Sequence, residues 1–146
     1  MRYLIGVNFT PGADETPMEE WTREEVAAHL DYYRVLSREL VASGELIEST
    51  ILTGPDLAKI VRSDGRGAPV VTDGPFQEFK EWLAGYQIVE VESEERAVEI
   101  AALVSAVPGR NGVPTQQPIH LRRIMDDEGP FGPTEMEEYL QQATGA

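Results

Sequence analysis

Residues 85–91 read GYQIVEV, a short run in which apolar side chains occupy both odd and even positions. A strand with apolar residues on both faces is one that the folded protein covers on both faces. The stretch therefore predicts a central strand of a sheet. The elements before and after it should be arranged around that strand.

The residues after this strand predict a helix and a last strand. Ser93 is a favourable helix N-cap, and two glutamates follow it where the helix dipole favours negative charge, so we expect a helix over residues 94–106. Pro108 cannot continue that helix. A further strand is expected over Ile119–Met125. The face of the helix expected to lie close to the sheet consists of Val98, Ala101, Ala102 and Ser105.

The residues before the central strand predict a strand over 45–52 and then a hairpin. Two short runs, 57–62 and 68–72, are separated by Ser-Asp-Gly-Arg-Gly at 63–67. A five-residue loop that contains an Asp-Gly pair is typical of a β-hairpin.

The start of the chain predicts a strand and a long helix. Residues 2–9, RYLIGVNF, alternate between apolar and other side chains, as a half-buried strand does. A helical period follows over Glu19–Ser43, with Thr22 and Glu25 at capping-box spacing and Gly44 placed to end the helix. The apolar positions of this helix, three and four residues apart, are Val26, Leu30, Tyr33, Leu36 and Leu40.

The resulting order, β, long α, β, hairpin, β, α, β, predicts an α+β protein with a ferredoxin-like two-layer sandwich over residues 1–125. Two helices can cover only one face of the sheet, and strands 2–9 and 86–91 also carry apolar residues on the other face. We therefore expect a homodimer formed through the uncovered face. Residues 126–146 form a polar C-terminal extension, with a short helix expected around Glu135–Gln142.

The composition narrows the possible partners. The 146 residues carry 26 acidic and 12 basic side chains, a net charge of −14, so neither nucleic acid nor an anionic membrane surface is an expected partner. The sequence has no cysteine, and it has no apolar run of signal-peptide or membrane-span length. We expect a soluble cytoplasmic protein. Two distant histidines and the acidic run 126–128 lack the spacing of a metal site, and no nucleotide-binding motif is present, so no metal or cofactor is expected.

One motif links the hairpin to the central strand: TDGPFQEFKE at residues 72–81, followed by Gly-Tyr. With it, the chain resembles the YCII-related family, specifically the branch with the DGPF motif. The matching positions are Asp73, Gly74, Pro75, Phe76, Glu78, Lys80, Glu81, Gly85 and Tyr86. The resemblance implies a dimeric α+β barrel, in which two ferredoxin-like sheets pack face to face. It does not imply a reaction, although some members are associated with sigma factors and some distant relatives act on small aromatic molecules.

Two residues are candidates for acid–base chemistry. His29 corresponds by position to a helix-borne histidine suggested as catalytic in distant relatives, and it lies on or beside the apolar stripe of its helix. A histidine there is either a hydrogen-bonded core residue or a general acid or base. Asp73 either caps the turn that follows it or orients His29.

The residues expected to bind a ligand are Gly74, Phe76, Phe79, Lys80 and Tyr86. Two hypotheses of function remain open. One is a non-catalytic dimer that binds a small metabolite, in a regulatory role. The other is a cofactor-free lyase, isomerase or hydrolase that uses His29 with Asp73.

Overall fold

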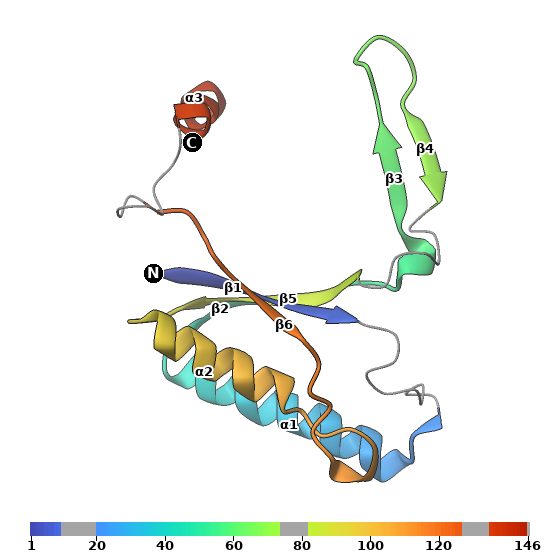
Figure 1. Cartoon of the computed structure of the whole chain (residues 1–146), viewed down its shortest axis with the longest axis vertical. Helices are drawn as coiled ribbons and strands as arrows, with labels where there is room; N and C mark the ends of the chain where they lie inside the picture. Colours follow the sequence, from blue (N-terminus) through green and yellow to red (C-terminus); the bar gives the residue numbers. More distant parts are fainter. Residues whose placement is uncertain (10–19, 74–81, 127–134, 146) are drawn as a thin grey trace.

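The computed structural model describes residues 1–9, 20–73, 82–126 and 135–145. Its main elements follow the expected order, with an arm-like hairpin inserted before the fifth strand and a helix near the C-terminus (Figure 1). They are β1 (Arg2–Phe9), α1 (Arg23–Ala42), β2 (Leu46–Ile51), β3 (Lys59–Arg62), β4 (Val70–Asp73), β5 (Trp82–Glu90), α2 (Glu94–Ser105), β6 (Ile119–Arg123) and α3 (Glu135–Thr144). Two single-turn 3₁₀ segments, η2 (Pro55–Leu57) and η3 (Arg110–Gly112), lie in the connections.

The principal sheet has four antiparallel strands in the order β2-β5-β1-β6. Helices α1 and α2 both lie on one of its faces, as Figure 1 shows. This is the ferredoxin-like α+β sandwich that the element order predicts. The strand containing GYQIVEV is central, as expected, although it begins earlier than predicted, at Trp82.

The core lies between this sheet and the two helices. Alternate residues of the central strands point into it, so that Ile5 and Val89 have no exposed surface, and Leu40 of α1 and Ile100 of α2 close it from the other side. Each fully buried aliphatic side chain of this kind contributes about 1.5–3 kcal/mol to folding.

The inner face of α1 differs in one position from the predicted stripe. Leu30 is 53% exposed, and His29 takes the core-facing position instead. The inner residues are therefore His29, Tyr33, Leu36 and Leu40, whose spacings of four, three and four follow one face of a helix. The prediction of Leu30 as a core residue was wrong. It assigned the core position to the apolar Leu30, whereas the structure places the neighbouring polar residue, His29, there.

The inner face of α2 was also misplaced. Val98 is 52% exposed and Ala102 is exposed, whereas the buried residues are Ala97, Ile100 and Val104. Only Ala101 and Ser105, both half-buried, fit the prediction. Ala97, Ile100 and Val104 therefore pack against the sheet. The predicted face of small residues points partly toward solvent.

The helix caps are those that the sequence predicts. The Thr22 hydroxyl accepts a hydrogen bond from the Glu25 backbone N–H, and the Glu25 carboxylate accepts one from the Thr22 N–H. Ser93 caps α2 through the N–H of Arg96 at 3.1 Å. Gly44 has φ +80°, the left-handed conformation that ends α1.

Two elements stand apart from this body. Strands β3 and β4 form the predicted hairpin as a separate two-stranded sheet. In Figure 1 this hairpin and α3 both project on the side of the principal sheet away from α1 and α2, at opposite ends of it. We call residues 59–73 the hairpin arm.

Candidate functional site

His29 is held in the core by three neighbours. Its Nδ1 lies 2.9 Å from the carbonyl oxygen of Pro108, and because a carbonyl only accepts, Nδ1 carries the proton. The rings of Trp21 and Tyr33 meet the imidazole edge to face, with centroids 5.4 and 5.2 Å away. Burial raises the pKa of Tyr33 to about 12, so this neighbour stays neutral at physiological pH. These contacts match the interpretation of His29 as a hydrogen-bonded core residue.

The loop that supplies the Pro108 carbonyl is fixed to the start of α1. The Asn111 backbone N–H donates to the Glu25 carboxylate, and the pKa of Glu25 is lowered by this bond and, more strongly, by the bond from the Thr22 N–H. A Cβ on Gly109 would lie 2.8 Å from Thr115 Cγ2 and 3.5 Å from the Trp21 ring. The tight contact is therefore with Thr115 in the same connection, whereas the Trp21 ring would be at ordinary van der Waals distance.

Asp73 lies at the end of β4, on the hairpin arm. Its carboxylate pairs with Lys59 on the neighbouring strand, and its side chain is 83% exposed. The hairpin arm and α1 lie on opposite sides of the principal sheet (Figure 1). The structure therefore does not bring Asp73 and His29 together within one chain.

Of the residues expected to bind a ligand, Gly74, Phe76, Phe79 and Lys80 lie outside the described residues. Tyr86 is described. It alternates with the buried Gln87, so it lies on the sheet face opposite the helices, where its hydroxyl is 3.4 Å from Glu48 Oε1. We call this uncovered surface the open face.

The centre of the open face is apolar. Leu4 alternates with the core residues Tyr3 and Ile5, and its register partner Ile88 lies on the same side of the sheet. Gly6 lies between the side chains of Leu4 and Leu83, which a Cβ at this glycine would approach to 3.4 and 3.3 Å. Leu4, Leu83, Tyr86 and Ile88 form the apolar part of the open face.

The side of the open face that runs along the edge strand β6 is polar and basic. The Asn8 amide nitrogen lies 3.3 Å from His120 Nδ1 and 3.4 Å from Nε2, so one ring nitrogen accepts from it. Arg122 follows His120 by two residues and therefore points to the same side. Within the part of the chain that the structure describes, the Arg122 guanidinium has no ion-pair partner.

His120 is exposed. Sequence reasoning did not identify Asn8, a polar residue near the end of β1. Its contact with His120 depends on the pairing of β1 with β6, and the two residues are more than a hundred positions apart in sequence.

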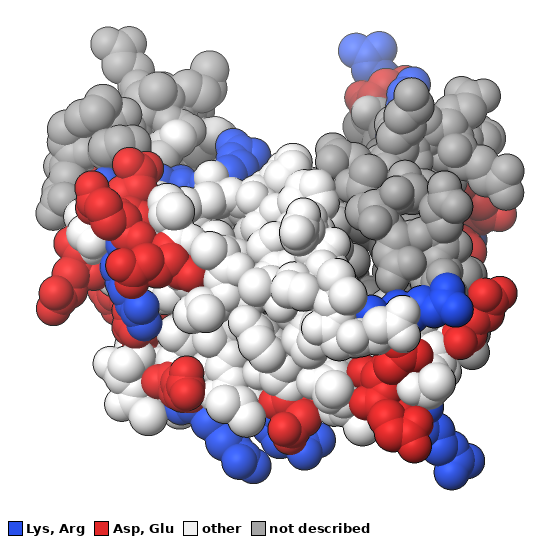
Figure 2. All heavy atoms as spheres, turned by 60° about the horizontal axis from the view of Figure 1, so that its bottom comes forward, with Lys and Arg blue, Asp and Glu red and all other residues white. Residues whose placement is uncertain are grey.

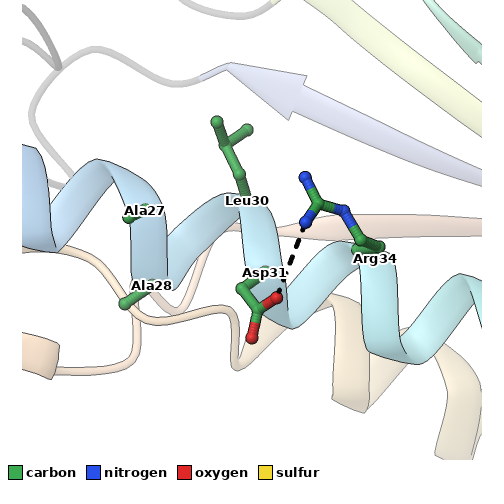
Figure 3. A pocket seen from close by; sticks show the side chains of 5 residues that line it. All are labelled: Ala27, Ala28, Leu30, Asp31 and Arg34. Carbon is green, nitrogen blue, oxygen red and sulfur yellow. Dashed lines mark ion pairs between the residues drawn. The ribbon is translucent and has the colours of Figure 1, made fainter.

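A hollow on the helix layer is a poor alternative site. It is lined by five residues of α1 alone, Ala27, Ala28, Leu30, Asp31 and Arg34 (Figure 3). Its two charged side chains pair with each other at 3.9 Å and stand exposed on the helix surface. On the helix side of the molecule, acidic and basic side chains both lie around an uncharged area, as Figure 2 shows. Neither feature offers converging polar groups to a ligand.

The described residues hold no cluster of three or more His, Cys, Asp or Glu side chains suited to a metal ion. Among the helices that they form, none has the length and apolar character needed to cross a bilayer.

Comparison with known proteins places this fold in a family. An uncharacterized protein, R00369, from Rhizobium meliloti (strain 1021) is 28% identical over 108 residues, which cover 74% of this chain and 86% of the relative. The sequence profile of the YCII-related domain matches residues 1–118, the segment that contains β1 to α2 and the loop up to β6. The chain belongs to the YCII-related domain family.

Proposed function

We propose that the protein is a homodimer whose two open faces pack together and enclose a binding site for a small organic anion. The observation that carries this proposal is the one-sided sheet, in which both helices cover the same face (Figure 1). The other face combines a central apolar group with basic side chains along the edge strand β6. Packing two such faces together would form the dimeric α+β barrel that the family resemblance implies.

The apolar part of the open face supports the dimer. An antiparallel sheet that meets water on one face normally carries polar residues there. Here Leu4, Ile88 and Leu83 occupy the middle strands, and Leu83 is 40% exposed in the single chain. A second copy would remove these side chains from water, at about 25 cal/mol for each Å² of apolar surface buried.

The basic side of the open face, along β6, supports an anionic ligand. A guanidinium binds a carboxylate or phosphate through two parallel hydrogen bonds, and an imidazole or amide N–H can add another. These groups line the open face along β6: Arg122 is level with Leu4, His120 with Gly6, and Asn8 with Leu83. Residues 74–81 lead directly into Trp82 at the start of β5, so Gly74, Phe76, Phe79 and Lys80 are retained as proposed ligand-binding residues.

We favour binding over catalysis because the described residues offer no acid–base pair. His29 donates to a backbone carbonyl, and Asp73 pairs with Lys59 on the hairpin arm. A metabolite-binding, regulatory role is consistent with this arrangement.

Titration calorimetry with benzoate, a carboxylate on an apolar ring, tests the ligand site. Arg122→Gln should weaken benzoate binding about ten- to a hundredfold, as expected for loss of a charged hydrogen-bond partner. Arg38→Gln removes the same charge from the exposed surface of α1 and should leave the affinity unchanged. Equal affinities for wild type and Arg122→Gln, or no heat of binding for benzoate, would count against an anion site here.

Sedimentation analysis tests the assembly. Wild type should sediment with twice the 16.2 kDa mass of the chain. Ile88→Arg, at the centre of the open face, should yield a folded monomer, whereas Val98→Arg on the outer surface of α2 should remain dimeric. A monomeric wild type, or a dimer that Ile88→Arg leaves intact, would refute the proposed interface.

A further inference from the structure

We propose that, in the homodimer, the hairpin arm of each protomer packs against helix α3 of its partner. This inference rests on the dimer proposed above and adds a second contact outside the paired sheets. Its starting point is that the hairpin arm and α3 are the two elements standing away from the body, both on the side of the open face (Figure 1).

The hairpin arm exposes apolar side chains on both of its faces. Val61 and Val71 face each other across one side and are 59% and 54% exposed, and Val70 on the other side is 62% exposed. An isolated two-stranded hairpin is marginally stable in water at best. The hairpin arm therefore needs a cover that the rest of the described chain does not supply.

Helix α3 has the matching property. Its ten residues are too few for a stable isolated helix. Its sequence places Met136, Tyr139, Leu140 and Ala143 at the spacings of one apolar stripe, and Leu140 is 52% exposed. A short amphipathic helix of this kind is stabilised by packing its stripe on an apolar surface.

The charges of the two elements are complementary. Arg62 and Arg66 of the hairpin arm form no ion pair with any described residue. The C-terminal residues 126–146 contain no Lys or Arg and six acidic side chains, Asp126, Asp127, Glu128, Glu135, Glu137 and Glu138. The hairpin arm, with three basic and two acidic side chains, has a net charge of +1 in a chain of net charge −14, so this pairing brings a basic element to an acidic segment that has no Lys or Arg.

Symmetry allows the contact. The hairpin arm and α3 project at opposite ends of the open face (Figure 1). Two open faces can meet through a twofold axis that is perpendicular to the plane of Figure 1. This rotation turns the second protomer upside down and also exchanges its two ends. Each hairpin arm then lies beside the partner's α3. The other twofold arrangement brings hairpin arm to hairpin arm and sets the arginines of both copies near one another. Charge favours the first arrangement.

Cross-linking between single-cysteine variants tests the arrangement, because the chain has no cysteine of its own. Full-length Val71→Cys and Leu140→Cys are mixed, allowed to exchange subunits and treated with a short bismaleimide. A covalent dimer in the mixture, absent from either variant alone, is the expected result. A product from Val71→Cys alone indicates the hairpin-to-hairpin arrangement and overturns the inference. Val98→Cys on the outer face of α2 is the control that should not cross-link with either.

Charge reversal gives an independent readout. Arg62→Glu with Arg66→Glu should raise the dimer dissociation constant about tenfold or more, and adding Glu137→Arg and Glu138→Arg should restore it. A monomeric wild type would refute the proposed dimer itself. A stable wild-type dimer with no mixed cross-link and no effect of charge reversal would refute only the hairpin–α3 contact.

Discussion

Gly85 marks a position in β5 where no side chain fits. A Cβ there would lie 2.9 Å from the Thr50 carbonyl oxygen of the neighbouring strand, closer than real Cβ atoms approach. The obstacle is backbone, so it cannot rotate away as a side chain can. This contact gives a physical reason for the glycine that opens the Gly-Tyr pair of the family motif.

We predict that Gly85→Ala destabilises the protein by about 1–3 kcal/mol, because the pairing of β5 with β2 must shift. Gly67→Ala is the matched control. At Gly67 a Cβ would meet nothing within 4 Å, so the alanine should be neutral or slightly stabilising. Urea unfolding of both variants measures the difference. A Gly85→Ala protein as stable as the Gly67→Ala protein would contradict the steric argument.

His29 gives a second prediction at a single residue. Replacing it with alanine removes the bond to Pro108 and two aromatic contacts, and we expect a loss of about 2–3 kcal/mol in unfolding free energy. His29→Gln keeps a donor for the carbonyl and should lose less. Urea unfolding measures both. An alanine variant with wild-type stability would show that the histidine is not a structural residue and would reopen a chemical role.

Between α2 and the start of β2, one ion pair connects two elements. The Arg96 guanidinium donates to both carboxylate oxygens of Glu45, at 2.8 and 3.0 Å, and to Glu99 at 2.9 Å. Glu45 is only 17% exposed, whereas Glu99 is 65% exposed. Hydrogen bonds from Arg96, and a weaker one from Ser43, lower the pKa of Glu45 below its ordinary value of 4.5.

A lowered carboxylate pKa makes this stabilisation dependent on pH. Its full contribution is present above the unfolded value near 4.5, and it is lost as the pH falls through the lower folded pKa, where the folded state must take up a proton. Glu45→Gln should therefore have a lower melting temperature than wild type at about pH 7, and this difference in melting temperature should become smaller at about pH 3. Thermal unfolding by circular dichroism measures both. Glu99→Gln is the control and should show a smaller gap, and a Glu45→Gln gap that stays constant with pH would contradict the assignment.

The elements were the most predictable level of the structure, because caps and periodicity are local. Thr22, Ser93 and Gly44 fixed the helix ends, and the Asp-Gly pair at 64–65 placed the hairpin loop. Which side of a helix faces the core was less predictable. His29 displaced Leu30 because the Pro108 carbonyl satisfies its polar atom, and that partner is 79 residues away in sequence.

The candidate site was predicted less well for the same reason. Tyr86 was identified through its motif and lies on the open face, but the polar residues Asn8 and His120 of that face belong to β1 and β6, the first and last strands of the sheet in chain order. Asn8 meets His120 only because β6 pairs with β1. No local pattern contains that information. For the motif residues 74–81, the predictions stay predictions, since these residues lie outside the described part of the chain.

The assembly of the whole molecule carries its own prediction. If the folded chain is stabilised by a partner copy, its melting temperature must rise with protein concentration, because association favours the folded state by mass action. Wild type should show this rise in a scanning-calorimetry dilution series. Ile88→Arg should melt lower and at a temperature independent of concentration. A wild-type melting temperature that is unchanged on dilution would argue against coupling between folding and assembly.

The position of β1 has a consequence for how the chain is made. It is synthesised before the other strands of its sheet, yet both its neighbours come late: Arg2 pairs with Glu90, and Tyr3 with Arg123. During translation the nascent β1 therefore has no strand to pair with until β5 has been synthesised, and it acquires its second neighbour only when β6 follows. Pairing over such separations is slow because long loops must close first. This strand thus stays unpaired while the residues up to β5 are synthesised, and this interval is when a nascent-chain chaperone would bind the sequence RYLIGVNF.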